Sequence, residues 1–402
     1  MPLPSIETIK NTIERQYSTA IHDKHLLGYK PLPGLLGPLF YPGGFGVVFP
    51  LVDSSGHKYA FRVWHKEIQG IKERTGKVSA FLKTQNLPYF VEFDYVSGGL
   101  TISDEHGDQT VDTVRMDWIE GENLHEFITS LKEDCSEKEF KSKMRTLAGN
   151  FKHMFKDLHQ SRISHGDLQH GNIVILPDLS IKLVDYDSVF VPTIAGEKQI
   201  TVGLSGYQHP SRKNRCDEAA EYDDYFSELI IYSGLLILSV DSSFWPDDEE
   251  EIDNFSFILT EKDFEDITSE TTGNRTLSFA DLKKLHSSKN FSKIINISSS
   301  LPEDQSTINE IRDLMLLLVK YLNTDDLSTL HPIPGTKRTN KRSIYYPQED
   351  TSQIDVESLR RTLSSLSKAS RRPSYPDADC QGSIAQIEKT DPEERKNKYR
   401  DQ

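Results

Sequence analysis

The most informative segment of the sequence reads His165-Gly166-Asp167-Leu168-Gln169-His170-Gly171-Asn172. Two short apolar, β-branched runs follow within residues 173–184, and the second ends at Asp185-Tyr186-Asp187. Two such runs separated by turn residues predict a β-hairpin. Asn172 would lie just before the first strand of the hairpin and Asp185 just after the second. Mg²⁺ prefers oxygen ligands of the kind that these two side chains provide. We therefore expect Asn172 and Asp185 to form a magnesium site, with the carboxylate of Asp167 beside it.

This arrangement resembles the catalytic loop H-R-D-x-K-x-x-N of protein kinases and the D-F-G that follows it, with the same spacing between the three polar residues. The resemblance implies that Asp167 orients an acceptor hydroxyl and accepts its proton, and that Asn172 and Asp185 bind Mg²⁺. Gln169 stands where the family has the lysine that contacts the transferred phosphoryl group. Loss of that cation is expected to slow transfer unless another group compensates.

Upstream residues resemble the nucleotide-binding motifs of the same family. Gly43, Gly44, Phe45 and Gly46 look like the glycine-rich loop that covers the phosphates of ATP, with Tyr41 in place of the first glycine. Ala60-Phe61-Arg62 lies where the family has V-A-I-K. The resemblance therefore implies that the Arg62 guanidinium contacts the phosphates of ATP.

Met116-Asp117-Trp118-Ile119 resembles the hinge between the two kinase lobes. Met116 would be the gatekeeper, and the backbone groups of Asp117 and Ile119 would bind adenine. Further along, Gly203 to Pro210 resembles the end of a kinase activation segment, and Asp224-Tyr225-Phe226-Ser227 resembles the D-x-W-S that opens a buried central helix. The similarity covers roughly residues 35–330, and it is closest to bacterial eukaryote-like kinases that read H-G-D-L-Q-H-G-N.

Several residues depart from the family pattern. Arg62 replaces a lysine, and Arg and Lys are not interchangeable where a planar cation binds phosphate. Its usual glutamate partner would be Glu73, but helical periodicity turns Glu73 away from the apolar stripe formed by Ile68, Ile71, Val78 and Leu82, so we expect it to be exposed.

Gly166 replaces an arginine that often binds an activation-loop phosphate, which argues against activation by loop phosphorylation. Asp187 fills the glycine position of D-F-G, where it is either a further metal ligand or a solvated carboxylate. Ser211 replaces a structural glutamate, so the salt bridge of that glutamate must be absent or replaced.

Periodicity predicts an α+β fold with two lobes, a small antiparallel β-rich N-lobe and a larger helical C-lobe. Strands are expected within 39–64 and at 89–95 and 111–119, and helices at 6–13, 67–84, 124–131, 140–158, 229–240 and 308–322. The predicted boundaries are an N-terminal helix and lead-in segment at 1–34, the N-lobe at 35–118, the C-lobe at 119–330, and a Ser/Thr/Arg-rich, mostly disordered tail at 331–402.

Composition restricts the partners of the protein. The chain has 402 residues and a formal net charge of -15, which repels nucleic acid and anionic membranes. Three widely separated cysteines, Cys135, Cys216 and Cys380, indicate neither a disulfide framework nor a thiolate zinc site. No signal peptide and no apolar run of membrane-spanning length is present. We expect a cytoplasmic protein that binds neither nucleic acid nor membrane.

The resemblance implies an ATP- and Mg²⁺-dependent serine/threonine protein kinase. Its substrate would be a protein hydroxyl, and Thr362, Ser364 and Ser374 of the tail, which lie beside paired arginines, are candidate autophosphorylation sites. Two alternatives remain open. Arg62, Gln169 and the missing helix glutamate are compatible with a pseudokinase that binds nucleotide or a partner, and H-G-D is common in small-molecule kinases of the aminoglycoside and choline type.

Overall fold

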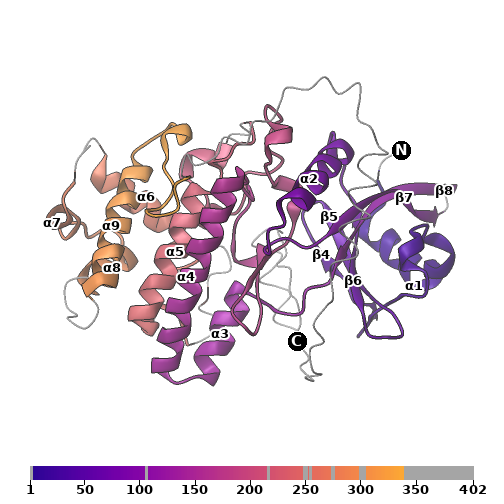
Figure 1. Ribbon diagram of the computed structural model, residues 1–402, viewed down its shortest axis with the longest axis horizontal. Coiled ribbons are helices and arrows are strands. Elements are labelled where there is room, and N and C mark those ends of the chain that lie inside the picture. Colours follow the sequence, from indigo (N-terminus) through magenta and orange to yellow (C-terminus); the bar gives the residue numbers. More distant parts are fainter. Residues whose placement is uncertain are drawn as a thin grey trace. The chain divides into compact units, whose positions relative to one another are not determined.

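The N-terminal part of the protein is built on an antiparallel sheet with the strand order β1-β5-β6-β8-β7, and β4 pairs with β5 on the same side as β1. The structure is a computed structural model that describes residues 3–104, 107–214, 218–247, 252, 256–272, 277–297 and 305–338. Figure 1 shows the elements. The strands of this sheet are β1 (Lys30–Pro31), β4 (Tyr41–Pro42), β5 (Gly46–Val52), β6 (Lys58–Trp64), β7 (Phe93–Asp104) and β8 (Gly107–Asp117).

The register of the sheet decides which side chains reach the inner face. Val48 of β5 lies opposite Arg62 of β6, and Ala60 of β6 lies opposite Met116 of β8. Side chains alternate between the two faces of a strand, so these four residues share one face. Helix α2 (Ile71–Gln85) packs against β7. The phosphate and adenine motifs expected from the sequence therefore lie on one side of the sheet.

The other face of the sheet is covered by helix α1 (Ile6–Ala20), which packs against β7 (Figure 1). Ser5 caps this helix by accepting a hydrogen bond from the Thr8 N–H. Ile9 and Ile13 are fully buried in a core that also contains Phe49 of β5. The helix is longer than the expected 6–13, and the N-terminal segment is part of the N-lobe.

The strand expected at 89–95 instead begins at Phe93 and continues to Asp104. Its pairing with β8 changes register between Val96 and Leu100, where Gly98 and Gly99 lie. A bulge of this kind interrupts the alternation on which strand prediction depends. The two glycines therefore explain why the second half of β7 was not predicted from the sequence.

A second, smaller sheet lies where the hinge meets the catalytic loop. Its order is β11-β10-β9, with strands β9 (Glu122–Asn123), β10 (Ile173–Ile175) and β11 (Ile181–Leu183). Residues 173–183 form the hairpin that the sequence predicts. A separate hairpin consists of β2 (Pro33–Gly34) and β3 (Gly37–Pro38).

The C-terminal part of the described chain is helical and centres on α5 (Tyr225–Val240). Every residue of α5 from Phe226 to Ser239 is buried, as the apolar sequence predicts for a central helix. Helix α4 packs along it (Figure 1). The remaining helices are α3 (Leu124–Asp134), α4 (Glu137–Ser161), α6 (Glu261–Thr271), α7 (Phe279–Leu282), α8 (Lys289–Ile297) and α9 (Gln305–Leu322). Short 3-10 turns lie at Lys24–Leu26, His170–Asn172, Tyr186–Ser188, Pro192–Ile194, Ser205–Tyr207, Pro210–Asn214, Ser242–Phe244 and Leu327–Thr329.

These features make the fold α+β and protein-kinase-like, with a β-rich N-lobe and a helical C-lobe, and they confirm the fold class predicted from the sequence.

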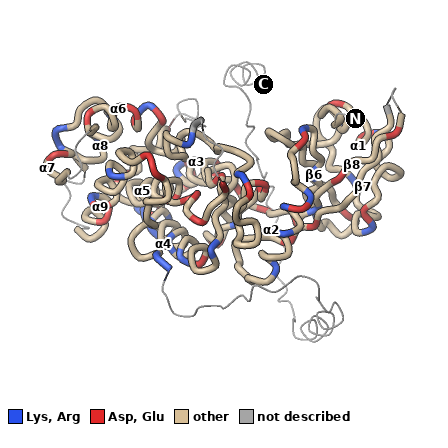
Figure 2. Tube along the Cα trace, turned by 90° about the horizontal axis from the view of Figure 1, so that it is seen from above, with Lys and Arg blue, Asp and Glu red and all other residues tan. Residues whose placement is uncertain are grey.

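The expected tail at 331–402 falls largely outside the described residues. Its first part is described, and Ile333 and Thr336 are fully buried there. Lys and Arg residues are interspersed with Asp and Glu residues over the described elements (Figure 2). Within the described residues, no helix is both long and apolar enough to cross a membrane.

Replacing Ile13 by Ala should lower the free energy of unfolding by about 2–4 kcal/mol, because it removes buried methyl groups between α1 and the sheet. Chemical denaturation monitored by circular dichroism measures the change. Arg15→Ala is the control, since Arg15 is exposed on the same helix and should shift the midpoint little. Equal effects of the two substitutions would show that α1 does not contribute to the N-lobe core.

Candidate active site

The catalytic-loop segment is held by a buried carboxylate at the start of α5. The backbone N–H groups of His165 and Gly166 both donate to Asp224, the second at 2.8 Å. Asp224 is 1% exposed. Burial raises its pKa to about 7, the nearby Glu228 charge adds to the rise, and the two backbone hydrogen bonds oppose it. The D-x-W-S-like segment seen in the sequence thus anchors the loop.

Two further hydrogen bonds join the loop to the hairpin. The His165 ring bonds through Nε2 to the Val184 carbonyl at 2.9 Å, and the Asn172 side-chain amide donates to the Asp167 carbonyl at 2.8 Å. The Val184 N–H donates to the Asn172 carbonyl at 3.0 Å. Asn172 and Asp185 therefore flank the hairpin at the same end, with Asp167 on the adjoining loop, as expected.

The glycine-rich segment forms a tight turn between β4 and β5. The Gly43 N–H donates to the Gly46 carbonyl at 2.7 Å, so Gly44 and Phe45 are the central residues of the turn. The His65 ring bonds to the Gly43 carbonyl at 3.0 Å. A Cβ atom at position 46 would lie 2.8 Å from Nε of Arg62. Glycine at 46 is therefore required for the turn to approach Arg62 so closely.

A cavity of about 40 Å³ lies on the inner face of the N-lobe sheet. One part of its wall is apolar and another part is charged. Met116, the expected gatekeeper, is in the wall, whereas Asp117 and Ile119 are not. No residue of the described chain accepts a hydrogen bond from the Ile119 N–H. The cavity is lined by Val48, Ala60, Arg62, Thr75, Phe93, Val114, Met116, Asp185, Tyr186 and Asp187.

An aromatic pair joins the glycine-loop strand to the hinge. The rings of Tyr41 and Trp118 lie 5.9 Å apart at an interplanar angle of 38°. Tyr41 stands in place of the first glycine of the family motif, and a glycine has no side chain that could make this contact. The hinge-like motif in the sequence includes Trp118, but nothing near it in the chain indicates its contact with Tyr41.

Arg62 binds two carboxylates at the start of the segment after the hairpin. Its Nη1 atom lies 3.1 Å from Asp185 Oδ1 and 3.0 Å from Asp187 Oδ1, and its Nη2 atom lies 2.5 Å from Asp187 Oδ2. Burial lowers the pKa of Arg62, but the two carboxylates outweigh burial and the net shift is upward. Asp187 therefore forms a bidentate ion pair, a role that differs from both roles considered for it. Glu73 is exposed, as predicted.

The buried position on α2 is occupied by Arg74, which is 4% exposed. Its guanidinium donates to backbone carbonyls on two sides of the segment, including Asp187 at 3.0 Å and Lys198 at 3.2 Å. It also donates to the Gln199 side chain at 3.3 Å. No sequence motif indicates Arg74, but the residue lies three positions after Ile71 and four before Val78, on the apolar stripe of the helix.

Gly166 is tightly enclosed. Its φ is +76°, and a Cβ atom would lie 2.3 Å from the Ser188 carbonyl oxygen and 2.4 Å from the Gln199 side-chain nitrogen. The arginine that the family often carries at this position cannot fit without displacing these neighbours. The packing around the loop therefore excludes an arginine at position 166.

Gln169 is 2% exposed, and its Oε1 accepts a hydrogen bond from the Gly171 N–H at 2.7 Å. The side chain caps the 3-10 turn of the loop. This contact differs from the phosphoryl contact expected from the family lysine. The described contacts give Gln169 a structural role and leave Asp167 as the candidate catalytic residue of the loop.

The segment that ends at Pro210 is fixed to the C-lobe by other means than the family glutamate. His209 bonds through Nε2 to the Tyr321 carbonyl of α9 at 2.8 Å. Arg212 donates to the Gln208 side chain at 2.7 Å and to the Asp223 carbonyl at 3.1 Å. These bonds replace the missing salt bridge at Ser211.

A buried aromatic cluster attaches the same segment to the catalytic loop. The rings of His125 and His170 stack with centroids 3.6 Å apart, and the His170 Nδ1 lies 2.7 Å from the Tyr207 hydroxyl. Burial lowers the pKa of His125 to about 3, so its ring is neutral at ordinary pH. This cluster holds Tyr207 against the loop.

A buried histidine connects residues 331–338 to α5. The His159 ring bonds to the Thr336 carbonyl through Nδ1 at 3.0 Å and to Glu228 through Nε2 at 2.8 Å. Burial lowers the pKa of His159, but the Glu228 charge and these hydrogen bonds raise it by more, so the net shift is upward. An imidazolium that donates on both sides accounts for both bonds.

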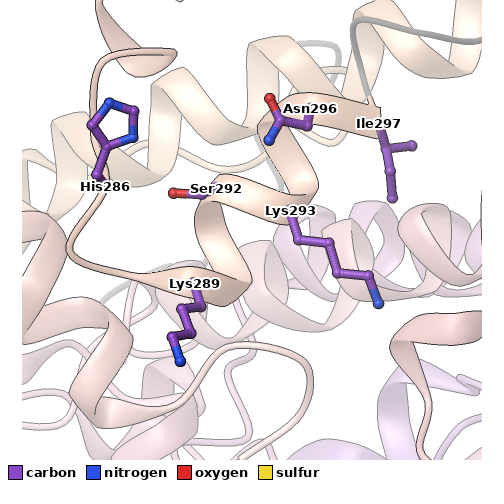
Figure 3. A pocket seen from close by; sticks show the side chains of 6 residues that line it. All are labelled: His286, Lys289, Ser292, Lys293, Asn296 and Ile297. Atoms are coloured by element: carbon purple, nitrogen blue, oxygen red, sulfur yellow. The ribbon is translucent and has the colours of Figure 1, made fainter.

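A larger hollow, of about 640 Å³, lies away from this site on α8 (Figure 3). Its side chains are His286, Lys289, Ser292, Lys293, Asn296 and Ile297. None of these residues belongs to the catalytic loop or the glycine turn. Within the described residues, no group of three or more His, Cys, Asp or Glu side chains forms a metal site. The smaller cavity beside Arg62 is therefore the candidate active site.

Comparison with known proteins finds a similar solved structure, the kinase PK-1 of Cydia pomonella granulovirus. The two chains are 14% identical, the match covers 77% of this chain and 96% of that chain, and the TM-score is 0.42. No protein-family model and no curated protein matches the sequence. The kinase-like fold is therefore established by the strand order and the catalytic-loop contacts themselves.

Gly166→Ala should destabilise the protein more than Gly56→Ala, by about 1–3 kcal/mol, because a methyl group at 166 overpacks the loop. Both glycines have positive φ, but nothing lies within 4 Å of a Cβ atom at Gly56. Gly56→Ala therefore controls for backbone strain alone. Thermal and urea unfolding of both variants measure the difference, and equal losses would contradict the close packing at Gly166.

His159→Gln should destabilise the protein most at acid pH. The raised pKa means that the imidazolium stabilises the fold fully below its ordinary pKa of 6.5, and this stabilisation is lost as the pH rises through the folded-state value. Removal of one partner from a buried ion pair costs about 3 kcal/mol or more. Urea midpoints of wild type and variant at about pH 6 and about pH 9 measure the change.

His153→Gln is the matched control, because His153 lies on the same helix with its side chain 72% exposed. This control variant should differ from wild type by the same small amount at both pH values. A destabilisation by His159→Gln that grows as the pH rises would contradict the charged state inferred for His159.

Proposed function

We propose that the protein transfers the γ-phosphoryl group of ATP to serine or threonine hydroxyls of proteins. The observation that carries the proposal is a cavity lined by both Arg62 and Asp185, which are hydrogen-bonded to each other. The glycine turn packs closely against Arg62, and the adjoining loop carries Asp167 and Asn172. Resemblance of the sequence to bacterial kinases that read H-G-D-L-Q-H-G-N supports the same proposal.

The residues around the cavity fit Mg²⁺ and ATP. Val48, Ala60 and Met116 provide apolar walls for the adenine ring, and the Ile119 N–H faces no acceptor in the described chain. Asn172 and Asp185 supply the oxygen ligands that Mg²⁺ prefers. When bound, Mg²⁺ would neutralise charge on the phosphates.

The chain's own residues have separate tasks in this reaction. Asp167 orients the acceptor hydroxyl and takes its proton as the oxygen attacks the γ-phosphorus, while the bond to the β-phosphate oxygen breaks and ADP leaves. Arg62 and the glycine turn position the phosphates. Because phosphoryl transfer has a loose transition state, positioning and charge neutralisation provide most of the rate enhancement.

A protein acceptor is favoured over a small molecule by the segment Gly203 to Pro210. This segment resembles a peptide-binding loop, and Tyr207 and His209 fix it to the C-lobe. Autophosphorylation of the C-terminal tail is part of the proposal, although Thr362, Ser364 and Ser374 lie outside the described residues. The proposed location of the reaction is the cytoplasm.

A nucleotide-binding module without transfer activity is the second candidate. Gln169 supports it, because the side chain that replaces the family lysine caps its own loop and brings no cation to the phosphates. In that case Arg62 and Asp185 would bind nucleotide, and the C-lobe segment would bind a partner.

Asp167→Asn and Asp185→Ala should each abolish incorporation of labelled phosphate from ATP and Mg²⁺ into the protein or into an added protein substrate, a loss of about 100-fold or more. Asp178→Asn, an exposed change in the β10–β11 turn, is the control and should keep activity. Thermal shift with and without nucleotide is measured in parallel.

The possible outcomes separate the candidates. Label in wild type that persists in both variants would refute the assigned roles. Nucleotide-dependent stabilisation without label in any acceptor would favour the binding module, and a phosphorylated metabolite would indicate a small-molecule kinase.

A further inference from the structure

The charges of the strand–helix ion pair of the kinase fold are rearranged in this protein. Active kinases pair a strand lysine with a glutamate of the helix that follows. Here the strand carries Arg62, the helix carries an exposed Glu73, and its buried charged side chain is the cation Arg74. Two cations cannot form the usual pair, so another group must connect them.

Asp187 supplies that connection. Its carboxylate binds the Arg62 guanidinium through both oxygens, at 3.0 and 2.5 Å, and its backbone carbonyl accepts from Arg74 Nε at 3.0 Å. Planar guanidinium and carboxylate groups in this bidentate arrangement form strong, directional contacts. Strand β6 and helix α2 are thus joined through one residue of the segment that follows the hairpin.

Arg74 also clamps the segment itself. It reaches the carbonyls of Ser188 and Val189 at 3.4 and 3.3 Å near the start, and the Lys198 carbonyl and the Gln199 side chain at 3.2 and 3.3 Å ten residues later. Most of these acceptors are backbone oxygens, which are always present. The clamp therefore forms without any modification of the chain.

The packing at Gly166 completes this arrangement. A side chain there would strike Ser188 and Gln199, the same residues that Arg74 binds. The chain thus has no arginine on the catalytic loop to bind a phosphorylated segment, and it places a buried arginine on α2 instead. The cation that orders the segment therefore lies on helix α2 of the N-lobe and not on the catalytic loop of the C-lobe.

We propose that Asp187 and Arg74 are positioning residues that together replace the strand–helix ion pair and hold residues 187–199 in place without phosphorylation. This inference rests on the proposed function. It deepens that function by making alignment of Arg62 depend on Asp187, and alignment of the whole segment depend on Arg74. Movement of α2 and of the segment is coupled as a result.

Hydrogen exchange tests the clamp independently of catalysis. Arg74→Ala should raise amide exchange about ten-fold or more in residues 187–199, because several hydrogen bonds from a charged group are lost. Arg74→Lys should have an intermediate effect, since one ammonium cannot reach both parts of the segment. Glu73→Ala is the control on the same helix and should leave exchange there unchanged.

An Arg74→Ala protein that unfolds cooperatively but exchanges like wild type over residues 187–199 would overturn the proposal. If Arg74→Ala fails to fold, Arg74→Lys decides by the same criterion. The measurement needs no nucleotide, so it remains valid if the protein proves to lack transfer activity and only the proposed function falls.

Asp187→Asn tests the positioning of Arg62. The variant should raise the concentration of ATP for half-maximal binding about ten-fold at fixed Mg²⁺, because Arg62 loses its bidentate partner. It should also raise the Mg²⁺ concentration needed for nucleotide binding, since Asp185 would then be the carboxylate that alone pairs with Arg62. Unchanged nucleotide and Mg²⁺ requirements, in a protein whose wild type binds nucleotide, would overturn this part.

Phosphatase treatment of the wild-type protein tests independence from phosphorylation. Exchange in residues 187–199, and any transfer activity, should be the same before and after treatment, with complete removal of phosphate verified by mass spectrometry. A rise in exchange after removal of phosphate from this segment would overturn the proposal.

Discussion

The buried carboxylate of Asp224 is the constraint on which the active-site geometry depends. It accepts two backbone N–H groups from the catalytic loop, and it stands at the start of a helix that is buried on all sides. Such a carboxylate is costly to desolvate, and the contacts that offset this cost are those that hold the loop. Once His165 and Gly166 are fixed, the His165 ring sets the end of β11, and Asn172 and Asp185 follow from the hairpin. The positions of the active-site residues thus depend on the helical core of the C-lobe.

Much of this could be predicted from the sequence, because the relevant signals are local. The apolar run of α5, the hairpin between Asn172 and Asp185, and the order of the glycine turn before Arg62 all depend on neighbours in the chain. The exposure of Glu73 followed from helical periodicity in the same way. These elements were sufficient for the fold class and for Arg62, Met116 and Asp185, which line the cavity, whereas Thr75, Phe93 and Val114 of its wall were not predicted.

The features that escaped prediction depend on contacts between distant segments. Nothing near Asp187 in the sequence indicates that its partner is Arg62, and only the fold brings the two together. Arg74 carried a signal, a charged residue on an apolar stripe, but its acceptors lie more than a hundred residues away. The hydrogen bond from the Gly171 N–H to the Gln169 side chain was not predicted, because family position does not determine which way a side chain turns. The second half of β7 was missed because Gly98 and Gly99 interrupt its alternation at a bulge.

The close packing at Gly166 has a consequence for how such a chain can evolve. An arginine cannot be acquired at 166 while Ser188 and Gln199 stay where Arg74 holds them, and loss of Arg74 releases them before a replacement is present. Each single step is therefore unfavourable in the background of the other residue, which is strong epistasis between positions in contact with the same partners. Related chains are expected to keep glycine at 166 together with arginine at 74, or to have exchanged both, and chains with only one of the two changes should be rare.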